Sequence, residues 1–250
     1  MNDVKSLWVV WQNPKTRSYY HIGTLSYFDN HYEFSYTSAQ KEYWKLNDAL
    51  KDEYMLHPAF PDPNKTYKSK ELFNAFDRRL PSPIRADFSI IMEELGLDKN
   101  HSKMEILEET RGRLANDTYS FERPLRVESD GNVHTSFFIH GMRYQKLPKN
   151  WPQLLKTIKT VTLVQEPENS YDPNAVAIYT ETGVKLGYIP GFYSKGVFAL
   201  LENGASPIVT ISKVNEISTP HWWVKLNYVS EIPSGNKRIP EFLAFVETAV

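Results

Sequence analysis

The chain opens with three short segments rich in large apolar, aromatic and β-branched residues. They span 4–11, 19–27 and 32–36, and the turn-forming stretches 13–15 and 29–31 separate them. Apolar runs of this length, bounded by Asn, Pro and Asp, are typical of β-strands joined by turns. We therefore predict an antiparallel β-meander at the start of the chain.

The segment 58–110 is predicted to hold a stretch without regular structure and then three helices. Three prolines between 58 and 63 disfavour regular structure there. Beyond them, apolar positions at helical spacing predict three helices, which span 70–76 with Ser69 as cap, about 83–95 with a stop at Gly96, and 103–110 with Ser102 as cap. Residues 118–121 are expected to return to the sheet.

The second half of the chain is predicted to consist mainly of β-strands. One helix is predicted at about 193–202, ended by Asn203 and Gly204. Six short strands surround it in the sequence, at 135–139, 160–165, 175–179, 185–189, 208–214 and 222–229. Six short strands with one helix favour a partly closed barrel.

The segment 122–133 carries Pro124, turn formers and charge with little apolar content, which marks a domain boundary. We predict an α+β domain at 1–124, a linker at 125–133, a mainly β, OB-like domain at 134–229, and a tail with a short helix at 230–250.

Composition narrows the possible functions. The 250 residues include no cysteine, which excludes disulfides and thiolate chemistry and fits a reducing cytoplasm. No apolar run approaches the roughly 18 residues of a membrane span, and the N-terminus does not resemble a signal peptide. Residues 1–133 hold 18 Lys and Arg against 21 Asp and Glu, whereas 134–229 hold 9 against 6. The positive excess of the second half is compatible with a few phosphate contacts.

Catalytic patterns are missing from the sequence. The two glycine patterns that bind phosphates, G-x-x-x-x-G-K-[ST] and G-x-G-x-x-G, do not occur. The G-x-S-x-G turn that carries the nucleophilic serine of many hydrolases is also missing. The histidines are scattered and no carboxylate pattern completes a metal site. We therefore expect a protein that is not an enzyme and needs no cofactor or metal. A nuclease is the enzyme alternative, but it needs clustered carboxylates for metal.

Three motifs in the second half carry a family resemblance. Residues 137–144 read FFIHGMRY, residues 163–178 read LVQEPENSYDPNAVAI, and residues 183–190 read GVKLGYIP. In this order and spacing they closely resemble the HIRAN domain. The resemblance implies an OB-type barrel which, in DNA-remodelling helicases, captures the 3′ end of single-stranded DNA.

The resemblance implies roles for particular residues. Arg143, Tyr171 and Asp172 would form the end pocket, with Tyr144 and Tyr188 beside it. Independently of the resemblance, the aromatic stretch His221-Trp222-Trp223 is a candidate for a second stacking surface, with Trp222 as its main residue. Arg offers a planar fork of donors for phosphate, and tyrosine rings can stack on bases. A carboxylate repels phosphate but accepts a hydrogen bond from a terminal hydroxyl, so Asp172 would select an end. Gln145 stands where the helicases carry a second tyrosine, and Tyr188 where they often carry histidine.

Each assignment has a structural alternative. Asp172 also fits the cap of its own turn, and Tyr144 fits the barrel core. Arg143 could pair with an acidic neighbour, and Trp222 could pack in the core with Trp223.

The first half is similar to the N-terminal subdomain of HipA-like toxin kinases. The resemblance covers 7–124 and rests on IGTL at 22–25, YEFSY at 32–36 and LFNAFDRRLP at 72–81 followed by Arg85. No kinase core follows these motifs, and free copies of this subdomain bind and restrain a separate kinase. The resemblance therefore implies partner docking by Arg79, Ser82 and Arg85. Salt bridges to Asp77, Asp87 or Glu93 are the alternative for the arginines.

Two functions remain open. One is an antitoxin-like regulator that binds a HipA-like kinase and a single-stranded DNA end. The other is a stand-alone DNA-end-binding protein in repair or phage defence.

Overall fold

The computed structural model describes the chain except for residues 1–5, 38–44, 98–99, 116, 234–246 and 249–250. It divides into two compact units, residues 1–123 and 124–250. Most of the tail predicted at 230–250, including its expected helix, lies outside the described residues.

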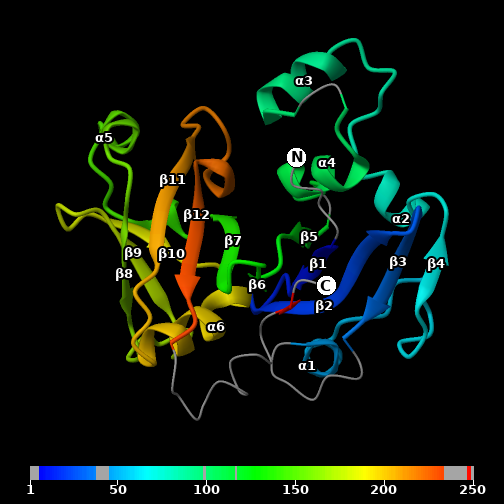
Figure 1. The fold of residues 1–250 in the computed structure, drawn as a ribbon, viewed down its shortest axis with the longest axis horizontal. Helices are drawn as coiled ribbons and strands as arrows, with labels where there is room; N and C mark the ends of the chain where they lie inside the picture. The colour runs from blue at the N-terminus through cyan, green and yellow to red at the C-terminus, as the bar shows by residue number, and fades with distance from the viewer. Residues whose placement is uncertain (1–5, 38–44, 98–99, 116, 234–246, 249–250) are drawn as a thin grey trace. The chain divides into compact units, whose positions relative to one another are not determined.

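The first unit is built on one antiparallel sheet with strand order β4-β3-β2-β1-β5 (Figure 1). The predicted meander is confirmed, and residues 118–121 return to the sheet as expected, beside β1. The strands are β1 (Ser6–Gln12), β2 (Tyr19–Phe28), β3 (His31–Tyr36), β4 (Tyr67–Ser69) and β5 (Tyr119–Glu122).

The region after the prolines differs from the prediction. Ser69 is not a helix cap but the last residue of β4, and its Oγ accepts a hydrogen bond from the N–H of Glu71. The helix α2 spans only Asn74–Asp77. Pairing of Tyr67 with Phe34 on β3 extends the sheet by one strand, which places the chain before α2 in an extended conformation.

Three further helices belong to this unit: α1 (Leu46–Lys51), α3 (Phe88–Leu95) and α4 (Lys103–Thr110). Gly96 ends α3 in the left-handed conformation, as predicted. Ser102 caps α4 as predicted: its hydroxyl accepts a hydrogen bond from the N–H of Glu105, and the Glu105 carboxylate accepts one from the N–H of Ser102. The core is largely aromatic, and its fully buried side chains include Leu7, Ile22, Leu25, Phe34, Phe60 and Phe121.

The second unit contains two antiparallel β-sheets and a parallel pair at one edge. Its strands are β6 (Arg126–Val127), β7 (Asn132–Phe138), β8 (Thr162–Gln165), β9 (Val176–Tyr179), β10 (Lys185–Tyr188), β11 (Ile208–Val214), β12 (Val224–Glu231) and β13 (Glu247–Thr248). One sheet has the order β10-β9-β8 and the other β11-β12-β7-β6-β13, in which β13 runs parallel to β6. The stretch predicted as a linker therefore includes a strand, β6, that pairs with β7.

Two isolated bridges join these sheets into a barrel-like ring. His140, just beyond β7, pairs with Tyr188 at the end of β10, and Thr160, just before β8, pairs with Thr210 on β11. Hydrogen bonds from Val161 to Val209 and from Ile211 to Lys159 extend the second bridge.

The helix α6 (Gly191–Glu202) confirms the predicted helix of this half. The helix α5 (Trp151–Thr157) and two 3₁₀ turns, η1 (Met142–Tyr144) and η2 (Pro220–Trp222), were not predicted. Among the side chains with no exposure are Phe137, Ile178, Leu186, Leu226 and Tyr228, which form the interior.

Candidate nucleic-acid interface

The strand end after β7 presents two side chains to solvent. Gly141 has φ +74°, a left-handed conformation that glycine adopts without strain, and it turns the chain into η1. Met142 is buried and anchors the turn, whereas Tyr144 is 73% exposed and Arg143 is exposed. Tyr144 is therefore not a core residue, which removes that alternative.

Arg143 and Tyr144 are paired with each other. The Arg143 guanidinium lies 4.5 Å from the centre of the Tyr144 ring and donates a hydrogen bond to its hydroxyl. A guanidinium over a ring face keeps donors free toward solvent. The two side chains therefore offer a cation and an aromatic ring at one place on the surface.

The loop 166–174 is organised by two side chains of its own. Asn169 Oδ1 accepts hydrogen bonds from the N–H groups of Tyr171 and Asp172, at 3.0 and 3.3 Å. Asp172 Oδ1 accepts from the N–H of Asn174 at 2.8 Å. These turns leave the Tyr171 ring 97% exposed. A large ring held outside the core in this way is available for stacking.

Asp172 has a structural role. Besides capping its turn, it accepts a hydrogen bond at Oδ2 from the Ser194 hydroxyl on α6, at 2.7 Å. The turn-capping alternative is therefore correct, and the carboxylate is also tied to the helix. Each oxygen retains acceptor capacity beyond the bond it makes.

Tyr188 is the point where the three sequence motifs meet. Its backbone exchanges two hydrogen bonds with His140, at 2.9 and 3.0 Å, which joins the first motif to the third. Its hydroxyl donates to Glu166 at 2.9 Å and accepts from Asn169 at 3.3 Å, which joins the second motif. The strand end that carries Arg143 and the loop that carries Tyr171 are thus both attached to Tyr188.

Gly187 makes the first of these junctions possible. A β-carbon at this position would lie 2.3 Å from the carbonyl oxygen of His140, and the backbone has φ +150°. Only glycine lets the two backbones approach this closely.

The Tyr188 hydroxyl belongs to a charged network. Lys185 Nζ donates to it at 2.7 Å and also binds Glu166. Burial opposes the charge of Glu166, but hydrogen bonds from Lys185, Tyr188 and Asn169 outweigh it and lower the pKa of this carboxyl. Burial likewise opposes the charge of Lys185, but its hydrogen bonds to Glu166 and Tyr188 and the charge interactions with both groups together outweigh burial and raise the lysine pKa. Both groups are therefore charged at neutral pH.

Sequence reasoning gave no role to four residues of this surface, which are Glu166, Asn169, Lys185 and Ser194. Glu166 and Asn169 stand inside the second motif, so the signal was present there. Lys185 stands inside the third motif, although its partner Glu166 lies 19 residues away. Ser194 stands outside the three motifs and its partner Asp172 lies 22 residues away, so no local pattern singles it out.

Trp222 is half-buried on η2, and its ring centre lies 5.5 Å from that of Phe138 at the end of β7. Trp223 is also half-buried, its ring centre lies 5.1 Å from that of Trp151 in a tilted arrangement, and its indole N–H donates to the carbonyl of Ser218. Both rings thus contribute to packing, as the alternative proposed in part, but each contacts a different ring and neither lies in the core, so Trp222 keeps part of its surface in solvent.

The predicted docking residues divide into one buried and two exposed residues. Arg79 is 7% exposed, forms a salt bridge to Asp117 and donates to the carbonyl of Gly112 at 3.0 Å. It cannot serve as a surface contact, and the prediction is corrected. Ser82 and Arg85 are exposed, and Arg85 pairs with Asp87 at 2.8 Å, as the salt-bridge alternative proposed.

Among the residues that the structure describes, no group of three or more histidine, aspartate or glutamate side chains is arranged to hold a metal ion. Within the same residues, no helix combines the length and apolarity needed to cross a membrane.

Residues 132–227 match the model of the HIRAN domain family. Two crystal structures are similar to part of the chain. A protein from Lactobacillus plantarum has 23% identity and a TM-score of 0.33, with 40% of this chain and 97% of that chain covered. The HIRAN domain of human HLTF has 18% identity and a TM-score of 0.31, with 41% and 81% covered. No curated protein matches the chain.

The family match confirms the HIRAN resemblance over 132–227, and a HIRAN domain implies a DNA-binding role. The comparisons give no support to the HipA resemblance of the first unit.

Proposed function

We propose that this protein binds the end of a DNA single strand on the surface formed by η1, the loop 166–174 and the end of β10. The observation that carries the proposal is the junction at Tyr188. It attaches the exposed Arg143 and Tyr144 pair and the exposed Tyr171 ring to one strand end of a HIRAN domain. Separately, each feature is an ordinary surface feature, but together they supply a cation and two rings.

The residue types suit single-stranded DNA. Arg143 offers donors to a phosphate, and stacking of a base on an exposed ring such as Tyr171 contributes about 1 to 3 kcal/mol per base. Asp172 would favour a terminal hydroxyl over a phosphate because its carboxylate accepts from the first and repels the second. We take the barrel to be OB-like and the captured end to be the 3′ end.

The proposed activity is binding without catalysis. The sequence carries none of the catalytic patterns considered above, and the hydroxyl that donates to Asp172, that of Ser194, belongs to a residue only 3% exposed. The carboxylates of the surface are occupied by structural partners, Glu166 by Lys185 and Tyr188, and Asp172 by Ser194.

The test is fluorescence anisotropy with a labelled ten-nucleotide strand that ends in a 3′ hydroxyl, compared with the same strand ending in a 3′ phosphate. We expect tighter binding of the hydroxyl strand and about a tenfold loss with Tyr171→Ala, which removes roughly 1.4 kcal/mol of stacking. Arg143→Ala should weaken both strands.

The matched control is Lys156→Ala, which removes one positive charge from an exposed side chain of α5 in the same unit. Equal losses for Lys156→Ala and Arg143→Ala would show a non-specific charge effect and contradict the proposed site. Lack of binding to either strand would contradict the proposal as a whole.

A second function, docking of a partner protein by the first unit, is favoured by the loop between α2 and α3. Ile84 is 95% exposed there, between the exposed Ser82 and Arg85. An apolar side chain beside a cation on a protruding loop suits a protein contact. A HipA-like kinase as the partner rests on the sequence resemblance alone. Co-purification of such a kinase with wild type, lost with Ile84→Asp, is the expected result, and equal recovery by both would contradict it.

A further inference from the structure

The first unit ends on one side in an open strand edge. β4 pairs with β3, and no other strand among the described residues pairs with it (Figure 1). An edge strand exposes N–H and C=O groups that can pair with a further strand. The edge thus has the chemistry to accept an extended peptide.

A hollow lies against this edge. It has a volume of about 530 Å³, and its lining residues are Ala59, Phe60, Lys65, Thr66, Tyr67, Lys68, Phe73, Asn74 and Ala75. Three of its lining residues are aromatic and pack together, with the Phe60 ring centre 5.1 Å from that of Tyr67 and 5.2 Å from that of Phe73. A strand added to β4 would place every second side chain on the face of the sheet where the hollow lies. The hollow therefore suits an apolar side chain.

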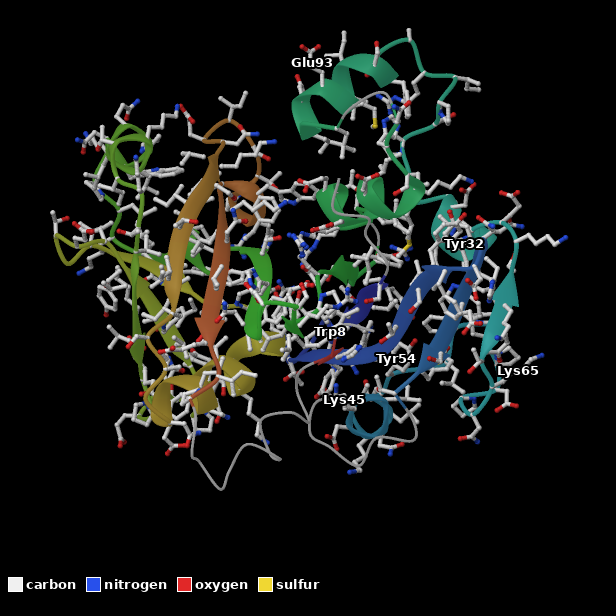
Figure 2. All side chains as sticks on the ribbon, in the orientation of Figure 1. Trp8, Tyr32, Lys45, Tyr54, Lys65 and Glu93 are labelled. Carbon is white, nitrogen blue, oxygen red and sulfur yellow. The ribbon has the colours of Figure 1, made fainter. Side chains whose placement is uncertain are left out.

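The edge is basic. Lys65, Lys68 and Lys70 are exposed within a stretch of six residues, with Lys65 on the outer side of β4 (Figure 2). The Lys65 ammonium lies 5.3 Å from the centre of the Tyr67 ring, and Lys68 pairs with Glu33 on β3. Lysines on an edge repel a second copy of the same edge and favour a strand of opposite charge.

The geometry points to a peptide-binding site: we propose that β4 takes up an extended acidic segment of a partner protein as an added strand, with an apolar side chain of that segment in the hollow. Main-chain hydrogen bonds would give affinity, and the hollow and the lysines would give specificity. A peptide suits this site better than nucleic acid, because Phe60 is 1% exposed and Tyr67 and Phe73 are half-buried, so no ring stands free for a base.

The first experiment is a selection of random decapeptides displayed against the full-length protein. We expect enrichment of peptides in which Asp or Glu flank an apolar or aromatic residue. A representative peptide should slow amide hydrogen exchange in β4 and should bind at least tenfold more weakly to Lys65→Glu. Lys68→Gln provides a second variant that places no new charge beside Glu33.

The control is Lys51→Glu, a charge reversal at an exposed lysine of α1, a helix that contacts β2. Two N-methylated versions of the peptide test strand addition directly. One is methylated at every odd-numbered amide and the other at every even-numbered amide. One copy should lose binding and the other should retain it, because only alternate amides of an added strand face β4.

Three outcomes would overturn the proposal: no enrichment of acidic peptides, equal binding to wild type and Lys65→Glu, or equal loss with both methylated copies. A loss of single-stranded DNA binding by Lys65→Glu would assign the basic edge to nucleic acid instead. Peptide binding at β4 is tested independently of the HIRAN surface, since Arg143→Ala should leave it unchanged.

Discussion

The hydroxyl of Ser194 on α6 donates a hydrogen bond to Oδ2 of Asp172 at 2.7 Å, while Oδ1 of the same carboxylate caps the turn at Asn174. One side chain thus fixes the loop of Tyr171 both internally and to the helix. Any role of Asp172 in recognising a DNA end is added to this structural role, so a test must separate the two.

Asp172→Asn separates them. The amide oxygen of asparagine can still accept the N–H of Asn174, so the turn is kept, while the charge is removed. If the charge disfavours a terminal phosphate, the preference for a 3′ hydroxyl should fall by roughly fivefold, the equivalent of about 1 kcal/mol for unit charges some 4 Å apart in water. Anisotropy with both strands measures the ratio. An unchanged ratio would show that the carboxylate acts only as a cap.

Gly187→Ala tests the junction between the first and third motifs. The new β-carbon would lie 2.3 Å from the His140 carbonyl oxygen, at φ +150°, and we expect the free energy of unfolding to fall by about 3 kcal/mol from the clash and the strain together. Urea unfolding of the full chain gives the value.

Gly183→Ala is the matched control for this prediction. Gly183 also has positive φ, but nothing lies within 4 Å of its β-carbon position, so strain alone should cost about 1 kcal/mol. Equal losses for the two variants would mean that the close approach of Gly187 to His140 contributes nothing.

Arg79→Ala tests the corrected role of this arginine. Its salt bridge to Asp117 and its bond to Gly112 are lost, and we expect the first unit to be destabilised by about 3 kcal/mol, as for other buried pairs that lose one partner. Hydrogen exchange at β1, compared with β12, assigns the loss to the first unit. Arg85→Ala should leave the amide exchange of both β1 and β12 unchanged, since Arg85 is exposed. Equal effects of the two variants would contradict the assignment.

The Glu166 network predicts a pH dependence. The pKa of Glu166 is lower in the folded chain than its ordinary value of 4.5, so its charge stabilises the fold above that value. This stabilisation is lost as the pH falls through the lowered pKa. Below about pH 4.5 the urea midpoint of wild type should therefore fall more steeply than that of Glu166→Gln. Parallel curves would contradict a charge role for this group.

The sequence predicted elements whose pattern is local. β1 to β3 were predicted because apolar runs alternate with turn residues, and α4 because Ser102 stands directly before it as a capping residue. β4 was missed because it is three residues long and includes a lysine and a serine, so that only its pairing with β3 makes it a strand. The helix α5 was missed although Pro152 near its start is a helix-initiating signal.

The candidate site, too, could be predicted from the sequence only where its pattern is local. The motif spacing identified the segments that carry Arg143, Tyr171 and Tyr188. The contacts that join them depend on the tertiary fold, since Glu166 and Tyr188 meet across 22 residues of chain. The burial of Arg79 likewise follows from Asp117, 38 residues away, and no local pattern reveals it.

The bridge between His140 and Tyr188 has a mechanical consequence. Among the described residues, a single bridged pair closes this side of the barrel-like ring, whereas full ladders join its other neighbouring strands except at Thr160. A DNA end held by Arg143 and Tyr171 would span this seam and hold together one of the two places where an isolated bridge, rather than a full ladder, closes the ring. Ligand at a hundred times its Kd adds about 2.7 kcal/mol to stability by mass action. That gain should be concentrated at the seam, where amide exchange of His140 and Tyr188 would slow most.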